Sequence, residues 1–94
     1  MPVKAYQRDL KDTINNKTYQ LTVRPHLGGW LAIVILVGED MRWEKQTAPN
    51  APLDDAKEWA IKKALIEAHG SKYEEVYPLA AALNESWTDI DLPA

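Results

Sequence analysis

The chain has 94 residues, of which 46% are hydrophobic and 27% are charged, and its net charge is −3. This length suits one hydrophobic core, and this composition excludes an intrinsically disordered chain. The chain contains no cysteine, which excludes disulfides, thiolate metal sites and cysteine nucleophiles. We therefore expect residues 1–94 to form a single domain in a reducing cytoplasm.

The longest apolar run, Trp30–Val37, is far shorter than the roughly 20 residues that a membrane-spanning helix needs. The N-terminal region turns charged after a few residues and lacks the apolar run of a signal peptide. We expect neither a membrane anchor nor an export signal.

The first elements predict a β-hairpin. Thr18–Arg24 alternates apolar and polar residues, as a strand with one wet face does. Asn15 and Asn16 before it suit a two-residue turn, which would place Leu10 opposite Leu21. Apolar residues in positions 3–14 also recur at intervals of three and four, so an N-terminal helix remains an alternative.

Two further strands are predicted after a turn at Pro25–Gly29. Trp30–Val37 is rich in β-branched residues, which is typical of a central strand covered on both faces. Gly38–Asp40 then turns the chain into Met41–Thr47, which alternates like a half-exposed strand. Short connections favour antiparallel neighbours, so we expect an antiparallel meander of three to four strands.

One long helix should follow the sheet. Pro52 lies near its first turn, His69 near its end, and Gly70 is its predicted stop. Trp59 and Ile66 form a separate stripe, which we expect to receive the C-terminal segment. The broad apolar side, which should cover the sheet, comprises Leu53, Ala60, Ile61, Ala64, Leu65 and Ala68.

The C-terminal part predicts a short helix over about 78–86, after Pro78, and an acidic tail. Thr88–Ala94 alternates polar and apolar residues and is interpreted either as an edge strand or as a loose tail. The predicted fold class is thus α+β: a meander packed by one long helix, then a short helix and the acidic tail.

The chemistry-bearing residues do not predict an enzyme. His26 lies in a turn and His69 at a helix end, and neither has a carboxylate at metal-ligand spacing. The paired acids lie where turns and helix starts ordinarily carry them, and no nucleophile has an evident base. We expect no catalytic site, no metal and no cofactor.

Charge is distributed unevenly along the chain. Residues 1–72 hold all 11 basic residues and 9 of the 14 acidic ones, whereas residues 73–94 hold five acidic residues and no basic one. An acidic segment interleaved with aromatic residues suits a basic, partly apolar protein surface, although the same residues also suit a solvated edge packed by its own aromatics. The predicted partner-binding residues are Trp43, Glu74, Glu75, Glu85, Trp87, Asp89 and Asp91.

The basic N-terminal hairpin supports an alternative function, which is nucleic-acid binding. Basic side chains beside an aromatic ring are typical of sheets that bind single-stranded nucleic acids. The residues predicted for this role are Arg8, Lys11, Lys17 and Tyr19.

Three segments of the chain carry a resemblance to known modules. They are Tyr19–Val23, Gly29–Ala32 and Leu53–Ala56, the last of which is expected to open a helix. In this order they resemble HicB-type antitoxins and other modules of three strands and a helix. The resemblance covers about half of the chain and implies an architecture rather than a function. Our hypothesis is a small non-catalytic regulatory protein that binds another protein, as an inhibitor, antitoxin or phage-type regulator does, and a homodimer is compatible with it.

Overall fold

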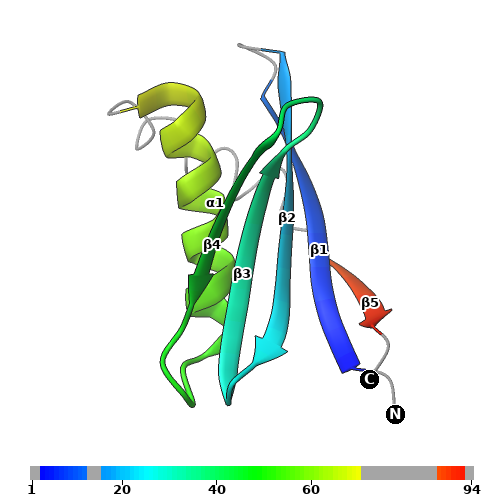
Figure 1. Cartoon of the computed structure of the whole chain (residues 1–94), viewed down its shortest axis with the longest axis vertical. Coiled ribbons are helices and arrows are strands. Elements are labelled where there is room, and N and C mark those ends of the chain that lie inside the picture. The colour runs from blue at the N-terminus through cyan, green and yellow to red at the C-terminus, as the bar shows by residue number, and fades with distance from the viewer. Residues whose placement is uncertain (1–2, 13–15, 71–86, 93–94) are drawn as a thin grey trace.

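The computed structural model describes residues 3–12, 16–70 and 87–92, which form a five-stranded antiparallel sheet and one helix (Figure 1). The elements are β1 (Val3–Asp12), β2 (Lys17–His26), β3 (Gly29–Leu36), β4 (Met41–Gln46), α1 (Leu53–His69) and β5 (Thr88–Leu92). The sheet order is β4-β3-β2-β1-β5, so β1 to β4 form a meander and β5 extends it beyond β1. The α+β class and the antiparallel meander are confirmed. The predicted short helix over 78–86 lies outside the described residues.

The N-terminal segment is strand β1, and the helical alternative is wrong. The predicted register is also wrong, because Leu10 lies opposite Tyr19 and not opposite Leu21. The strands separate after the pair Asp12 and Lys17, so the connection is longer than a two-residue turn. A shift of two residues keeps every side chain on its face of the sheet, and the predicted apolar face is therefore preserved.

The turn between β2 and β3 is a tight two-residue connection. Leu27 and Gly28 both have positive φ, 51° and 80°, between the paired residues His26 and Gly29. Positive φ at both central residues is the geometry of a type I′ turn, whose twist matches that of the flanking strands. This connection fixes the register of β3 against β2.

Helix α1 has the predicted ends. It begins after Pro52, with Asp54 and Asp55 in its first turn, where acidic side chains complement the helix dipole. Gly70 takes a positive φ of 62° and donates its backbone N–H to the carbonyl oxygen of Ile66. No helix in these described ranges is long and apolar enough to cross a bilayer.

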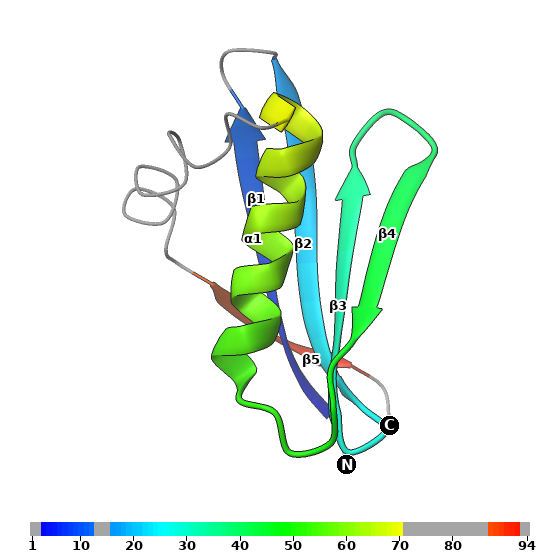
Figure 2. The same cartoon turned by 90° about the vertical axis from the view of Figure 1, so that its left-hand side faces the viewer.

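The core lies between α1 and one face of the sheet, mainly over β2 and β3 (Figure 2). Fully burying one leucine, valine or isoleucine side chain contributes roughly 1.5–3 kcal/mol, so this layer holds the fold together. The sheet contributes Leu10, Tyr19, Leu21, Val23, Ala32, Val34 and Leu36, and the helix contributes Ala56, Ala60, Ile61, Ala64 and Leu65.

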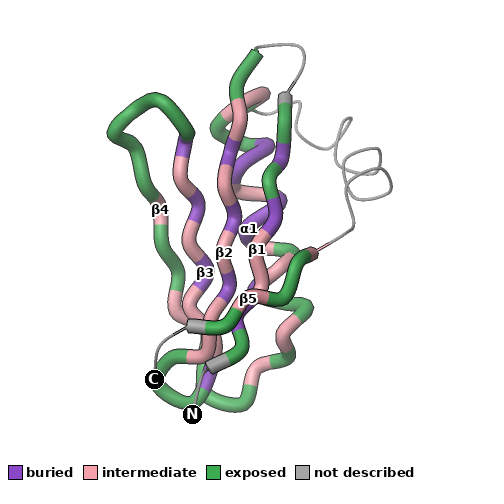
Figure 3. The backbone as a smooth tube through the Cα atoms, turned by 90° about the vertical axis from the view of Figure 1, so that its right-hand side faces the viewer, coloured by how far each residue is buried: buried purple, intermediate pink, exposed green. Residues whose placement is uncertain are grey.

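The opposite face of the sheet, which we call the open face, is not covered by α1 (Figure 3). Side chains alternate along a strand, so Leu31, Ile33 and Ile35 of β3 point to this face while Ala32 and Val34 point to the helix. All three are half-buried. The prediction that this strand is covered on both faces is therefore wrong for the described residues, because a single helix covers only one face of a sheet.

Candidate protein-binding surfaces

An aliphatic stripe runs along the middle of the open face. It consists of Leu31, Ile33 and Ile35, three side chains from β3 that water reaches in part. The strand pairing places polar and charged residues on both sides of it. From β2 these flanking residues are Gln20, Thr22 and Arg24, and from β4 they are Arg42, Glu44 and Gln46.

An apolar centre with a polar rim is the arrangement found in protein–protein interfaces. The open face of an antiparallel sheet normally carries polar side chains where it meets water. β3 carries a leucine and two isoleucines there instead. We call this set of three residues the β3 stripe.

Arg24 lies at one end of the β3 stripe. It is the β2 neighbour of Leu31, and both side chains lie on the open face. The Arg24 Nε atom is buried and has no hydrogen-bond partner within the described ranges. Arg24 as a whole is half-buried, and its guanidinium is a planar cation with several donors, so this end of the stripe suits a partner's carboxylate.

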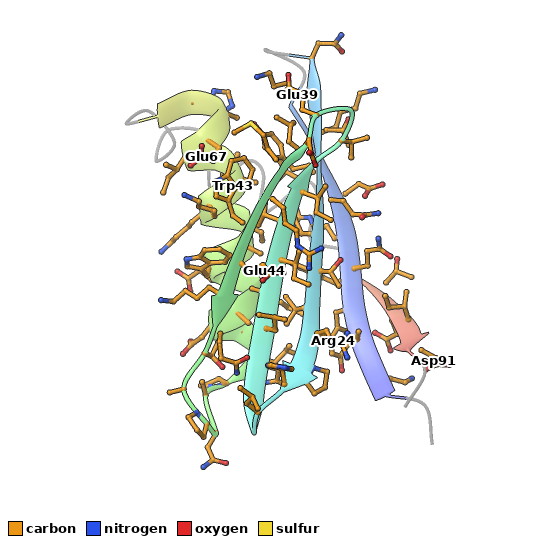
Figure 4. All side chains as sticks on the ribbon, viewed as in Figure 1. Arg24, Glu39, Trp43, Glu44, Glu67 and Asp91 are labelled. Atoms are coloured by element: carbon orange, nitrogen blue, oxygen red, sulfur yellow. The ribbon has the colours of Figure 1, made fainter. Side chains whose placement is uncertain are left out.

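The predicted partner-binding residues that the structure describes are distributed over both edges of the sheet. Trp43 lies on β4 at one edge of the sheet, whereas Asp89 and Asp91 lie on β5 at the other edge (Figure 4). Both aspartates are exposed, and Asp89 Oδ2 lies 3.6 Å from the Nζ of Lys4. Glu74, Glu75 and Glu85 lie outside the described residues.

Trp87 packs partly into the structure beside β1. It is half-buried against the core, and the guanidinium of the buried Arg8 lies 5.9 Å from its ring. The Lys57 ammonium lies 5.4 Å from the same ring and 4.6 Å from the ring of Tyr6. Two aromatic faces around one cation stabilise the junction between α1 and the sheet edge.

The other tryptophans also border the core. Trp30 and Trp59 are half-buried and pack against the core rather than inside it. Trp43 does the same on β4, with the Lys63 ammonium 5.7 Å from its ring. Trp59 lines a cavity of about 320 Å³ together with residues of β3 and β4 and the loop after β4. Most of the C-terminal segment that the Trp59/Ile66 stripe is expected to receive lies outside the described residues.

The residues predicted for nucleic-acid binding are also separated. Arg8 is 5% exposed and Tyr19 is 1% exposed, and both lie on the face that α1 covers. Lys11 is exposed on the open face, whereas Lys17 lies in register with the helix-covered side. A single-stranded nucleic acid would therefore find neither an accessible Tyr19 ring nor a continuous basic surface formed by these residues.

The described side chains have structural partners rather than a metal-binding arrangement. His26 Nδ1 lies 2.8 Å from Gln46 Oε1, which ties β4 to the β2–β3 turn. Across residues 3–12, 16–70 and 87–92, no three histidine, aspartate or glutamate side chains gather closely enough to hold a metal ion.

The stripe and Arg24 were not among the residues predicted from the sequence. The signal was present, because Trp30–Val37 is apolar at every second position on both of its faces. Recognising the surface required knowing which face of the sheet the described helix covers. No family model, curated protein or solved structure matches the chain.

Proposed function

We propose that this chain is a non-catalytic regulatory protein that binds another protein on the open face of its sheet. The β3 stripe carries the proposal, because a leucine and two isoleucines line a sheet face that α1 does not cover. Contiguous apolar side chains that remain partly accessible and have a polar rim are characteristic of binding surfaces. The partner would act as a second layer on this face, opposite the described helix.

The chemistry of Arg24 narrows the kind of partner. Its guanidinium is always charged, and its Nε is buried without an acceptor among the described residues. A partner that presents aliphatic side chains to the β3 stripe and a carboxylate near Leu31 would complement both the stripe and the accessible part of the Arg24 guanidinium. An inhibitor, antitoxin or phage-type regulator in the cytoplasm is the class of protein that we propose.

Capture from a lysate of the expressing cells tests the proposal. The immobilised wild-type chain is compared with the double variant Ile33→Thr/Ile35→Thr, which keeps β-branched side chains in the strand but removes apolar surface. The matched control is Asp9→Asn, a change at an exposed residue of β1 on the same face of the sheet. Circular dichroism verifies that all three chains are folded.

We expect a nuclease-resistant protein that the wild type and the control retain and the double variant loses. Equal capture by all three folded chains would contradict the open face as the binding surface. Loss of capture after nuclease treatment would favour the nucleic-acid alternative instead.

A further inference from the structure

The pairing of β4 with β3 determines which β4 residues direct their backbone N–H and C=O groups toward the open edge of the sheet. The backbone N–H of Thr47 donates to the carbonyl oxygen of Trp30 at 2.8 Å, so Thr47 directs its backbone groups toward β3. Successive residues of an antiparallel strand alternate between its two neighbours. Trp43 and Lys45 therefore bond to β3, whereas Arg42 and Glu44 direct their N–H and C=O groups away from the sheet.

We propose that β4 pairs antiparallel with β4 of a second copy of the chain, forming one continuous sheet across a two-fold axis. Only residues with outward-directed backbone groups can exchange hydrogen bonds across the new junction. The proposed register places Arg42 opposite Glu44 of the second copy, and Trp43 opposite Trp43. The inference goes beyond the proposed function and uses a different surface.

Charge selects this register over its neighbours. A shift by one hydrogen-bonded pair in one direction places two Glu44 side chains opposite each other, and a shift in the other direction does the same with two Arg42 side chains. Like charges directly opposite each other destabilise a sheet. Arg42 and Glu44 already form an ion pair within β4, with Arg42 Nε donating to Glu44 Oε1 at 2.8 Å. In the proposed register, Arg42 of each copy would lie beside Glu44 of its own strand and opposite Glu44 of the other copy, so every neighbouring pair has opposite charges.

The other side of β4 is compatible with the same pairing. Trp43 is half-buried beside α1, while Glu44 lies on the opposite side of the strand (Figure 4). Trp43 would form a non-hydrogen-bonded pair with its copy, the position at which side chains approach most closely. Lys45 would lie opposite Met41 of the second copy, whose side chain is 46% exposed and can accept the apolar stem of a lysine.

The fold leaves this edge accessible in the described part of the chain. α1 packs mainly over β2 and β3, and β4 is the outermost strand in both views (Figures 1 and 2). Charged residues on an edge strand commonly prevent sheet extension. The β4 edge differs because its two outward charges complement those of an identical strand.

Analytical ultracentrifugation over a concentration series tests the pairing. The wild type should dimerise reversibly, and Arg42→Glu and Glu44→Arg should each weaken the dimer at least about tenfold, because each places four like charges together. The double variant Arg42→Glu/Glu44→Arg reverses every sign and should restore dimerisation to within about threefold of the wild type. All three changes lie at exposed side chains and spare the core.

A wild type that stays monomeric up to roughly 500 μM would overturn the proposal, since even small interfaces associate weakly at such concentrations. A dimer that all three variants leave unchanged would overturn it as well and would move self-association to another surface, such as the β3 stripe. Capture of a partner by the monomeric variants would test the proposed function separately.

Cysteine cross-linking reads the register directly. The chain contains no cysteine, so one introduced residue can join only to its own copy. Non-hydrogen-bonded pairs have Cα atoms about 4.5 Å apart, which a disulfide can span. Trp43→Cys should therefore cross-link under mild oxidation. Lys45→Cys, on the same strand and face, should not, and preferential cross-linking through position 45 would overturn the register.

Discussion

Gly29 is the first residue of β3, and Thr47 and Ala48, which follow β4, pass close to it. A Cβ atom added there would lie 2.6 Å from both the Ala48 carbonyl oxygen and the Thr47 Oγ1. Thr47 Oγ1 also accepts a hydrogen bond from the Trp30 N–H at 2.8 Å. Moving Thr47 away from an added Cβ atom would therefore break this hydrogen bond. Overpacking costs about 1–3 kcal/mol and each hydrogen bond about 1 kcal/mol. We expect Gly29→Ala to lower the free energy of unfolding by about 3 kcal/mol.

Thermal unfolding followed by circular dichroism measures this loss, which corresponds to a fall in Tm of roughly 12–24 °C for a domain of this size. Gly38→Ala is the matched control, because Gly38 has a φ of 88° and no heavy atom within 4 Å of an added Cβ. It should cost only the left-handed backbone strain, about 1 kcal/mol. A Gly29→Ala variant as stable as Gly38→Ala would refute the argument that the returning chain confines this position.

Four further changes follow from burial and geometry, each measured by chemical denaturation. Leu21→Ala should lower the free energy of unfolding by about 2–5 kcal/mol, because Leu21 is fully buried and its truncation leaves a cavity. Lys57→Gln should lower it by about 1 kcal/mol, since the substitution removes the cation held between two aromatic rings. Leu27→Asn should raise it by about 0.5–1 kcal/mol, because Leu27 is 75% exposed at a φ of 51° that asparagine tolerates better. Asp89→Asn should change it by less than about 0.5 kcal/mol, because its ion pair is exposed on both sides. A large loss for Asp89→Asn, or none for Leu21→Ala, would contradict the burial on which these values rest.

Local patterns were sufficient to predict most of the element boundaries. The ends of α1 were predictable because Pro52 and Gly70 act within one turn of the chain. The register of the first hairpin was not, because Asn15-Asn16 suits a tight turn while the pairing ends at Asp12 and Lys17. Pairing is decided by the apolar face of the whole hairpin, and several loop lengths preserve that face.

Predicting the binding surfaces, unlike predicting the ends of the helix, required knowledge of how distant segments are arranged. Trp43 and Asp91 were grouped because both suit an interface, but the sheet order separates them onto opposite edges. Arg8 and Tyr19 were grouped by charge and aromaticity, whereas strand parity directs both toward α1. Which of the two faces of a sheet the helix covers is a tertiary outcome that a single strand's pattern does not contain.

Solvent exposure of the β3 stripe tests the proposed binding surface most directly. Methyl relaxation by a soluble paramagnetic probe can be measured for Ile33 and Ile35 in the free chain and after addition of the captured partner. Ile61, which is 6% exposed, and Ile66, which is 39% exposed, are internal references of the same residue type. We expect rates between those of Ile61 and Ile66 in the free chain and a fall toward that of Ile61 in the complex. Rates that match Ile61 in the free chain, or that the partner leaves unchanged, would contradict the open face as the binding surface.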